Sequence, residues 1–265
     1  MRVFFSDLDG TLLTSENIVS ARTREAINAF VAAGNKFVIC TGRPLSNAVR
    51  LQQRFGLDFP GSLLSAFNGA VLYDTARKTV IHETGIPIGL VGEIFDLAWS
   101  MDIFCVTYRD HYIVSPEYTE DLEYYLGQID MPVILNRDVT SDLTQPPWKI
   151  IAIDLQGPGR LQIFKQAMDA HFGRTVRTVF SSDIYLEIFP SDAGKGNALV
   201  RLCEILGVPL ENSLAAGDEE NDLSMIRAAG TGIAMCNGSK VVKDIADVIT
   251  SEDNDHDGLI PFLQP

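Results

Sequence analysis

The chain has 265 residues and carries 21 Lys and Arg against 35 Asp and Glu, which gives a formal net charge of −14. This acidic balance argues against nucleic acid or an anionic membrane surface as the main partner. No apolar run approaches the ~20 residues of a membrane-spanning helix, and the length suits one large domain or two modest ones.

The first eighty residues alternate between predicted strands and helices. Apolar runs at 3–5, 37–40 and 63–66 predict strands, and helices are expected from Ser20 to Gly34 and over 45–55. Strands that are almost continuously apolar and separated by helices indicate a parallel sheet with both faces covered.

The pattern changes over residues 82–188. Hairpin strands are predicted over 104–108 and 111–115, around a tight turn at Arg109 and Asp110. Further helices and strands of this block are predicted over 88–100, 119–128, 149–155, 159–172, 176–180 and 185–189. We therefore expect a separate α+β domain here.

Strand–helix alternation resumes after Pro190. The pattern predicts a helix over 195–206, a strand of small residues over 214–216, a helix over 223–229, a strand over 232–235 and a closing helix near Ser239. The predicted fold is thus α/β: a Rossmann-like, doubly wound parallel core of residues 1–81 and 189–265, interrupted by the inserted domain.

The four cysteines (Cys40, Cys105, Cys203 and Cys236) are scattered, and none forms a C-x-x-C pair. Free thiols in a reducing compartment are expected. The chain also begins on a predicted strand and not on a signal peptide, so the sequence predicts a cytoplasmic protein.

Polar residues gather where the core strands should end. Asp7 and Asp9 follow the first strand, and like charges this close need a metal, a shared proton or a cationic complex to compensate them. After the second strand, the Thr41 hydroxyl, the Gly42 N–H and the Arg43 guanidinium could face one anion.

Two further groups lie in the last third of the chain. Lys195 begins a helix, where the helix N-terminus and the ammonium both favour a phosphate. The acidic turn that holds Asp218, Asn221 and Asp222 offers hard oxygen ligands that suit Mg²⁺. Because strand ends of one parallel sheet converge on one crevice, these distant residues can meet.

Each group also has an ordinary structural interpretation. The aspartates after the first strand could belong to an ordinary Asp-Gly turn, and Thr41-Gly42-Arg43 could be a turn that leads into a helix. Lys195 could be a solvated helix cap, and the acidic turn could cap the N-terminus of a helix. Their joint occurrence favours a functional site.

Taken together, the polar groups resemble the four motifs of the haloacid dehalogenase superfamily, and within it the Cof-like hydrolases and sugar phosphatases. The matching residues are Asp7-Leu8-Asp9-Gly10-Thr11, Thr41-Gly42-Arg43, Lys195 and Gly217-Asp218 with Asn221-Asp222. The resemblance covers the core nearly end to end. For residues 82–188 only the place in the chain, between the second and third motifs, and the pattern of strands and helices resemble the α/β cap of the superfamily.

The resemblance implies a two-step phosphoryl transfer. Asp7 would be the nucleophile that forms an aspartyl-phosphate, and Asp9 would act as general acid and then base. Mg²⁺ would be held by Asp7, Asp218 and the backbone carbonyl of Asp9, with help from Asp222. The phosphoryl oxygens would be bound by a second set of residues: Thr41, Gly42, Lys195 and Asn221.

For the leaving group, the resemblance points to Arg43 and Asn68 of the core. In the cap, Ser182 and Asp183 are expected in a loop before a strand and are polar enough to bind sugar hydroxyls; Arg109 and His111 are further candidates. Ordinary turn residues are the alternative for every cap position.

The leading prediction is a Mg²⁺-dependent phosphatase of small phosphorylated metabolites, sugar phosphates first among them. One alternative keeps the intermediate but passes the phosphoryl group to another sugar, as a mutase or phosphotransferase does. Another is a non-catalytic, metabolite-binding regulator. The sequence does not distinguish a monomer from a homodimer.

Overall fold

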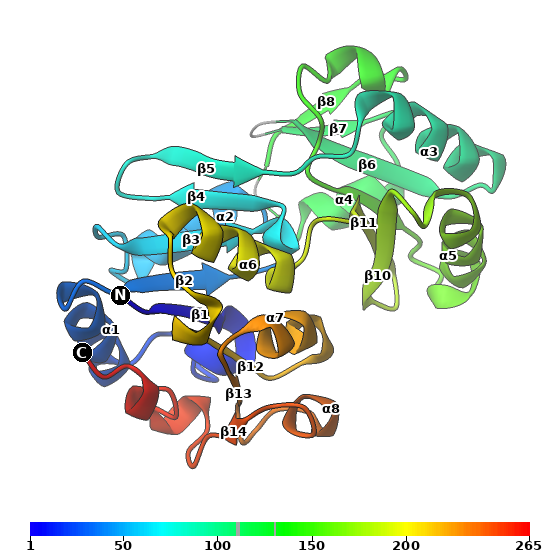
Figure 1. The fold of residues 1–265 in the computed structure, drawn as a ribbon. Helices are drawn as coiled ribbons and strands as arrows, with labels where there is room; N and C mark the ends of the chain where they lie inside the picture. Colours follow the sequence, from blue (N-terminus) through cyan, green and yellow to red (C-terminus); the bar gives the residue numbers. More distant parts are fainter. Residues whose placement is uncertain (110–111, 130) are drawn as a thin grey trace. The chain divides into compact units, whose positions relative to one another are not determined.

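The computed structural model describes residues 1–109, 112–129 and 131–265. They form two compact units, residues 1–83 with 193–265 and residues 84–192 (Figure 1). We call these the core unit and the inserted unit. Both unit boundaries fall slightly later in the chain than the sequence pattern suggested, after 83 and 192 instead of 81 and 188.

The core unit is built on an eight-stranded sheet in the order β14-β13-β12-β1-β2-β3-β4-β5. Its strands are β1 (Val3–Asp7), β2 (Lys36–Cys40), β3 (Ser62–Ala66), β4 (Val71–Asp74), β5 (Thr79–Glu83), β12 (Ser213–Gly217), β13 (Thr231–Ala234) and β14 (Val248–Ile249). The strands from β14 to β3 are parallel, as predicted for the core, although β14 itself was not predicted. The antiparallel pair β4 and β5 extends the sheet and was missed, because the chain folds back through the short 3₁₀ turn Phe67–Gly69 and not through an α-helix.

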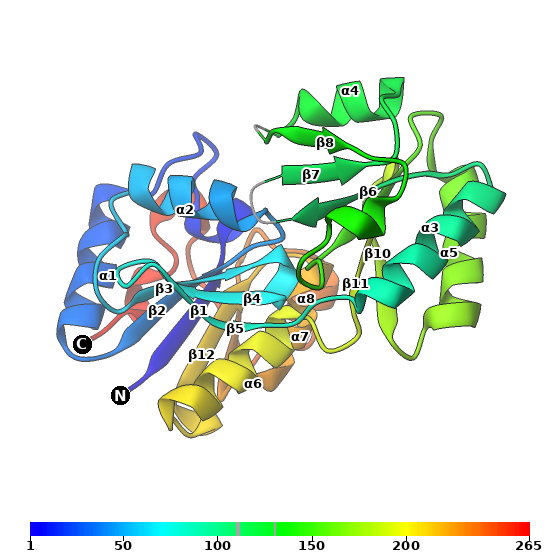
Figure 2. The same cartoon turned by 90° about the horizontal axis from the view of Figure 1, so that it is seen from above.

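Helices cover both faces of this sheet. They are α1 (Ala21–Ala32), α2 (Leu45–Arg54), α6 (Lys195–Leu206), α7 (Leu223–Ala228) and α8 (Lys240–Lys243). Figure 2 shows α1 and α2 on one side of the strands and α6 on the other. The structure thus confirms the α/β class, and short 3₁₀ turns complete the unit at Leu210–Asn212, Asn254–His256 and Ile260–Phe262.

Strand β1 shows how the sequence builds these layers, because successive side chains of a strand point to opposite faces. The Phe4 ring packs against Phe30 of α1 and Phe37 of β2, with ring centroids 6.3 and 5.8 Å apart. Its neighbours Val3 and Phe5 belong to the opposite layer, with residues of α6 and α7. A strand buried on both faces places its last residue, Asp7, with little freedom.

The inserted unit has its own six-stranded sheet, in the order β10-β11-β9-β6-β7-β8. Its strands are β6 (Phe104–Arg109), β7 (Tyr112–Ser115), β8 (Val133–Leu135), β9 (Ile150–Ile153), β10 (Val176–Ser182) and β11 (Tyr185–Pro190). The predicted pairing of β6 with β7 is antiparallel, although residues 110 and 111 of the predicted turn lie outside the described part. Strand β8, parallel to β7, was not predicted.

Three helices pack on this second sheet: α3 (Ile88–Ser100), α4 (Glu120–Leu126) and α5 (Pro158–Phe172). Residues of α3 and α5 share one apolar cluster with alternate residues of β6, β9 and β11. On the opposite face, Tyr125 of α4 hydrogen-bonds Tyr108 of β6 through the two hydroxyls. A 3₁₀ turn at Val139–Asp142 lies between β8 and β9. Each unit therefore has its own core.

No helix in the described residues is long and apolar enough to cross a bilayer. The four cysteines are free thiols, and three of them are buried.

Asp154 directly follows β9, and its hydrogen bonds make the stability of the inserted unit depend on pH in the acidic range. Its buried carboxylate accepts hydrogen bonds from Arg160 Nε at 2.8 Å and from the Gln156 N–H at 3.0 Å. Burial alone would raise the pKa of Asp154, but the bonds from Arg160 and Gln156 outweigh it, so the pKa lies below 3.8. A carboxylate whose pKa is lower in the folded state stabilises the fold above its unfolded pKa and loses this contribution as the pH falls through the folded value.

We therefore expect Asp154→Asn to lower the free energy of unfolding at pH 7 by about 1–3 kcal/mol, as for other hydrogen bonds to charged groups. The difference from the unaltered chain should shrink below pH 3.8. Urea titrations followed by tryptophan fluorescence report the unfolding of the inserted unit, because both tryptophans, Trp99 and Trp148, lie in it. The exposed Asp96 provides the control, and equal losses in Asp96→Asn and Asp154→Asn would contradict the prediction.

Candidate active site

The candidate site lies at the carboxyl end of the parallel core strands. Asp7 is the last residue of β1, and it lies opposite Cys40, the last residue of β2. On the other side, β12 runs parallel to β1 and ends at Gly217, directly before Asp218. The strand order therefore brings the first and last motifs together, as the sequence predicted for a parallel sheet.

Three carboxylates converge at this edge. One oxygen atom each of Asp7, Asp218 and Asp222 lies within 4.8 Å of the other two, and all three residues are buried. Such a set of hard oxygen donors matches the ligands of Mg²⁺. The residues present therefore fit a divalent cation.

Lys195 is the cation that the core itself supplies to this cluster. The residue begins α6 and is 2% exposed, and its Nζ lies 2.5 Å from Asp7 Oδ1 and 2.5 Å from Asp222 Oδ1. Buried ions are tolerated when they are paired and hydrogen-bonded. Lys195 thus ties the third motif to the first and the fourth.

Burial is the main cause of the pKa shifts of Asp7 and Asp218, and the Lys195 ammonium does not fully offset it. Burial raises the pKa of Asp7 to about 7, against the lowering effect of Lys195 and with a further rise from Asp222. Burial likewise raises the pKa of Asp218 to about 6, while the Thr11 hydroxyl lowers it. Lys195 would lose pKa by burial, but the two carboxylates raise it above 10.5. A further positive charge would relieve the remaining repulsion.

Asp218 is held in place by the turn that follows β1. Thr11 donates its hydroxyl to Asp218 Oδ1 at 2.7 Å, within the turn Leu8–Leu12. Gly10 of that turn has φ +78°, and a Cβ there would overlap the Asp218 carboxylate. Among the described residues, Asp7 Oδ2 and Asp218 Oδ2 accept no hydrogen bond, so these two atoms are available to a cation.

Asp222 differs from the other two carboxylates because protein donors occupy both of its oxygens. Oδ1 accepts from Lys195, and Oδ2 accepts from the N–H groups of Asp218 and Glu219 at 3.0 and 3.2 Å. Asp222 therefore orients Lys195 and fixes the turn that carries Asp218.

The second acid of the opening motif, Asp9, points elsewhere. Its carboxylate is 57% exposed and forms an ion pair with Arg43, with Nη2 at 3.0 and 3.1 Å from the two oxygens. The structure thus separates a buried Asp7 from an exposed Asp9 and joins Asp9 to the second motif.

The loops after β2 and β3 form one interlocked wall of the site. The N–H of Asn68 donates to the Thr41 carbonyl at 3.0 Å, and the N–H of Phe67 donates to the Arg43 carbonyl at 3.1 Å. A Cβ at Gly42 would lie 3.0 Å from the Asn68 side chain. Thr41 is buried, and its hydroxyl oxygen accepts a hydrogen bond from the Arg43 N–H at 3.2 Å. The hydroxyl proton of Thr41 can therefore be donated to another group.

Within the described chain, the other predicted site residues form no hydrogen bond or ion pair with the side chains of the carboxylate cluster. Asn221 lies in the 3₁₀ turn Glu220–Asp222 with an exposed side chain. Ser182 is the last residue of β10 and not part of a loop, because β10 extends beyond the predicted end, while Asp183 lies in the turn to β11. Both are exposed residues of the inserted unit. Arg109 ends β6, and His111 lies outside the described residues.

Sequence reasoning missed two residues that shape this edge. Thr11 was quoted only as part of a motif, although a hydroxyl four residues after Asp7 is a possible partner for the cluster. Asn237 Nδ2 donates to the Gly10 carbonyl at 2.8 Å, and no local sequence signal marks Asn237.

Comparison with known proteins agrees with this geometry. The family model of haloacid dehalogenase-like hydrolases matches residues 4–263. The chain is 30% identical to the 5-amino-6-(5-phospho-D-ribitylamino)uracil phosphatase YwtE of Bacillus subtilis, over 99% of this chain and 97% of the relative. It is 28% identical to the pyridoxal phosphate phosphatase YbhA of Escherichia coli, over 99% and 97%.

Solved structures are similar along almost the whole chain. A haloacid dehalogenase-like hydrolase from Bacteroides thetaiotaomicron superposes with a TM-score of 0.85 at 28% identity, covering 99% of this chain and 98% of the other. A structure from Thermotoga maritima also gives 0.85 at 28% identity, over 99% and 96%. These matches confirm the resemblance seen in the motifs: the chain is an enzyme of the haloacid dehalogenase-like hydrolase family, similar to its phosphatases.

Proposed function

We propose that this hydrolase is a Mg²⁺-dependent phosphatase that releases phosphate from small phosphorylated metabolites through an aspartyl-phosphate on Asp7. The observation that carries the proposal is the buried Asp7 carboxylate, with Lys195 Nζ at 2.5 Å and Asp218 in the same oxygen cluster. Sugar phosphates are the first substrates to examine. The free thiols suit a reducing compartment, and we place the enzyme in the cytoplasm.

In the first step, an Asp7 oxygen attacks the phosphorus and the bond to the leaving oxygen breaks. Asp9, at the exposed side of the turn, takes part in this step in its protonated form, after a proton from solvent has replaced its ion pair with Arg43, and gives that proton to the departing alkoxide. Thr41, the Gly42 N–H and Lys195 bind the phosphoryl oxygens, and Asn221 lies in the adjoining turn. Positioning and charge stabilisation supply most of the acceleration of phosphoryl transfer.

In the second step, the Asp9 carboxylate removes a proton from water, whose oxygen attacks the phosphorus. The bond between phosphorus and Asp7 breaks, which releases phosphate and restores the carboxylate. Asp7, Asp218 and the Asp9 carbonyl would hold the Mg²⁺, with Asp222 supporting them through Lys195 and the turn. When bound, the ion supplies positive charge that reduces the repulsion between Asp7 and an anionic phosphoester.

The proposal favours hydrolysis over transfer to a second sugar because the related proteins are named as phosphatases. Arg43 and Asn68 are proposed to contact the leaving group, since Arg43 borders Asp9 and Asn68 borders Gly42. Ser182 and Asp183 stay predictions for the inserted unit.

Asp7→Asn should lower phosphate release by about 10⁴-fold or more, because removing a nucleophile costs about this much in other enzymes. Phosphate is measured with Mg²⁺ over a panel of sugar phosphates and phosphorylated heterocycles. Asp58→Asn, an exposed change in the same unit, is the control. Turnover that persists in Asp7→Asn would refute the mechanism, and an isomeric sugar phosphate in place of free phosphate would indicate a mutase.

Gly10→Ala should raise the Mg²⁺ concentration needed for half-maximal activity and lower kcat by about 10²-fold, because the added Cβ displaces the Asp218 carboxylate. Gly34→Ala is the matched control, since Gly34 also has positive φ but no atom within 4 Å of the new Cβ. Both variants carry similar backbone strain. Equal activities of the two variants would show that the turn does not position a metal ligand.

Lys195→Met should lower the free energy of unfolding of the core unit by about 3–5 kcal/mol, because it leaves two buried carboxylates without their cation. Circular dichroism is the suitable probe, as the tryptophans lie in the other unit. The control is Lys243→Met, since Lys243 forms no ion pair in the described chain. An unchanged stability of Lys195→Met would mean that the ammonium is not needed to balance the cluster.

A further inference from the structure

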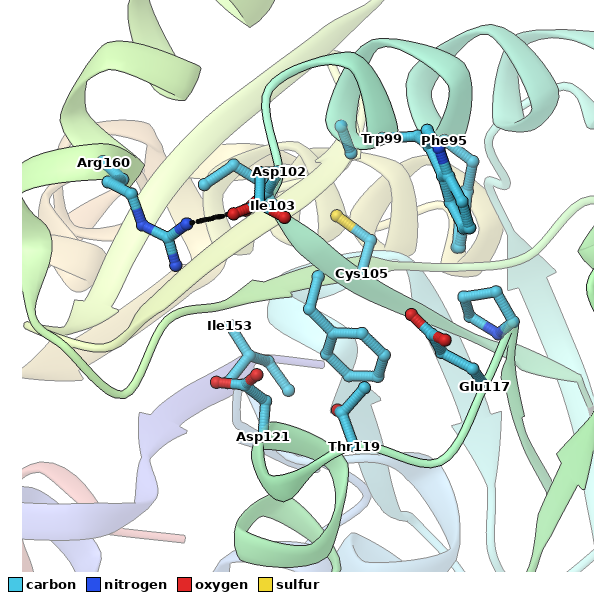
Figure 3. Close-up of a pocket in the computed structure, with 13 residues that line it drawn as sticks. Phe95, Trp99, Asp102, Ile103, Cys105, Glu117, Thr119, Asp121, Ile153 and Arg160 are labelled. Atoms are coloured by element: carbon cyan, nitrogen blue, oxygen red, sulfur yellow. Dashed lines mark hydrogen bonds and ion pairs between the residues drawn. The ribbon is translucent and has the colours of Figure 1, made fainter.

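A cavity of about 390 Å³ opens at one end of the sheet of the inserted unit. Its 13 lining residues come from the end of α3, the start of β6, the end of β9, the first turn of α5 and the segment leading into α4 (Figure 3). None of them belongs to the candidate active site. The volume is within the range of small-molecule sites in proteins.

Much of the lining of the cavity is apolar and aromatic. Phe95 and Trp99 of α3 line it with Phe104, Cys105 and Ile153. Trp99 is 56% exposed, although large aromatic rings are usually covered. The Arg137 guanidinium already lies 5.0 Å from the centroid of the Trp99 ring. Arg137 thus already supplies the cation for this ring, and the rest of its exposed surface is available to the apolar body of a ligand.

The charge around the cavity is mainly negative. The carboxylates of Asp102, Glu117 and Asp121 line it against one guanidinium, that of Arg160. Arg160 is already compensated, because it contacts Asp154 at 2.8 Å and Asp102 at 2.9 Å. Glu117 forms no ion pair with any described residue, and Asp121 accepts only the Leu155 N–H, at 3.2 Å. The cavity therefore repels anions, phosphorylated compounds included.

We propose that this cavity is a second ligand site, which binds a small organic cation: a primary amine with an aromatic or apolar body. The ammonium donates a charge-assisted hydrogen bond to the carboxylate of Glu117 or of Asp121. The body of the ligand packs against Phe95, Phe104 and Trp99 and displaces water from them. The charge of this ligand is opposite to that of the phosphorylated substrates proposed for the core unit, so the two sites select different compounds.

The probe is 2-phenylethylamine, and 3-phenylpropionate is its partner of opposite charge and similar shape. Saturation-transfer NMR on the full chain detects their binding, and the fluorescence of Trp99 in a Trp148→Phe background locates it. The amine should bind saturably and change the Trp99 emission, whereas the acid should do neither. Absence of saturable amine binding, or equal binding of the acid, would overturn the proposal.

Charge variants test the assigned residues. Glu117→Gln combined with Asp121→Asn should weaken the binding of 2-phenylethylamine at least about tenfold, because it removes both carboxylates that can accept a charge-assisted hydrogen bond from the ammonium. Glu123→Gln removes a charge from α4 at an exposed residue that does not line the cavity, and it should leave the affinity unchanged. Unchanged affinity in the double variant would overturn the assignment. Tighter binding of Nα-acetyllysinamide would also overturn it, since it would identify a protein lysine as the ligand.

Discussion

The mutual repulsion of three buried carboxylates is the constraint on which the core unit depends. Asp7, Asp218 and Asp222 come together because two neighbouring parallel strands, β1 and β12, end at the same edge of the sheet. The buried ammonium of Lys195 partly balances their charge, and backbone N–H groups donate hydrogen bonds to Asp222. Burial, with a smaller contribution from the neighbouring carboxylates, still raises the pKa of Asp7 and Asp218, and a bound cation would favour their charged forms.

The loops around this cluster are shaped by close approach. Gly10 lies against Asp218, and Gly217 lies against Asp222, at distances where a side chain would collide. Next to them, Phe67 and Asn68 adopt positive φ values of 50° and 54°, which cost conformational energy in residues other than glycine. The hydrogen bonds from these two residues to Arg43 and Thr41 hold the strained turn. Strain of this kind is typical of residues whose position matters for function.

The inserted unit is an independent structure with its own apolar core. It also has a buried ion pair, between Lys149 and Glu187 at 3.0 Å. Burial alone would lower the pKa of Lys149, but the charge of Glu187 outweighs it and raises the pKa above 10.5. The residues of the four motifs lie in the core unit, while the inserted unit carries features, such as the acidic and aromatic cavity, that the motifs do not require.

The sequence by itself determined the parallel core strands, their helices and the residues of the four motifs. These follow from local patterns: apolar runs that must be buried, caps and glycines that end helices, and carboxylates placed directly after a strand. What the sequence could not separate were residues with the same chemistry in the same turn. Asp218 and Asp222 both appeared as metal ligands, yet only Asp218 keeps an oxygen free of protein donors.

The tertiary structure alone decided the pairing of Asp9 with Arg43, the contact of Thr11 with Asp218 and the added strands β4, β5 and β8. It also decided where the lining of the cavity converges, since Trp99, Glu117 and Arg160 lie far apart in the chain. The physical reason is that local patterns fix what each segment becomes, whereas contacts between distant side chains depend on strand order and on how the packed layers orient each residue.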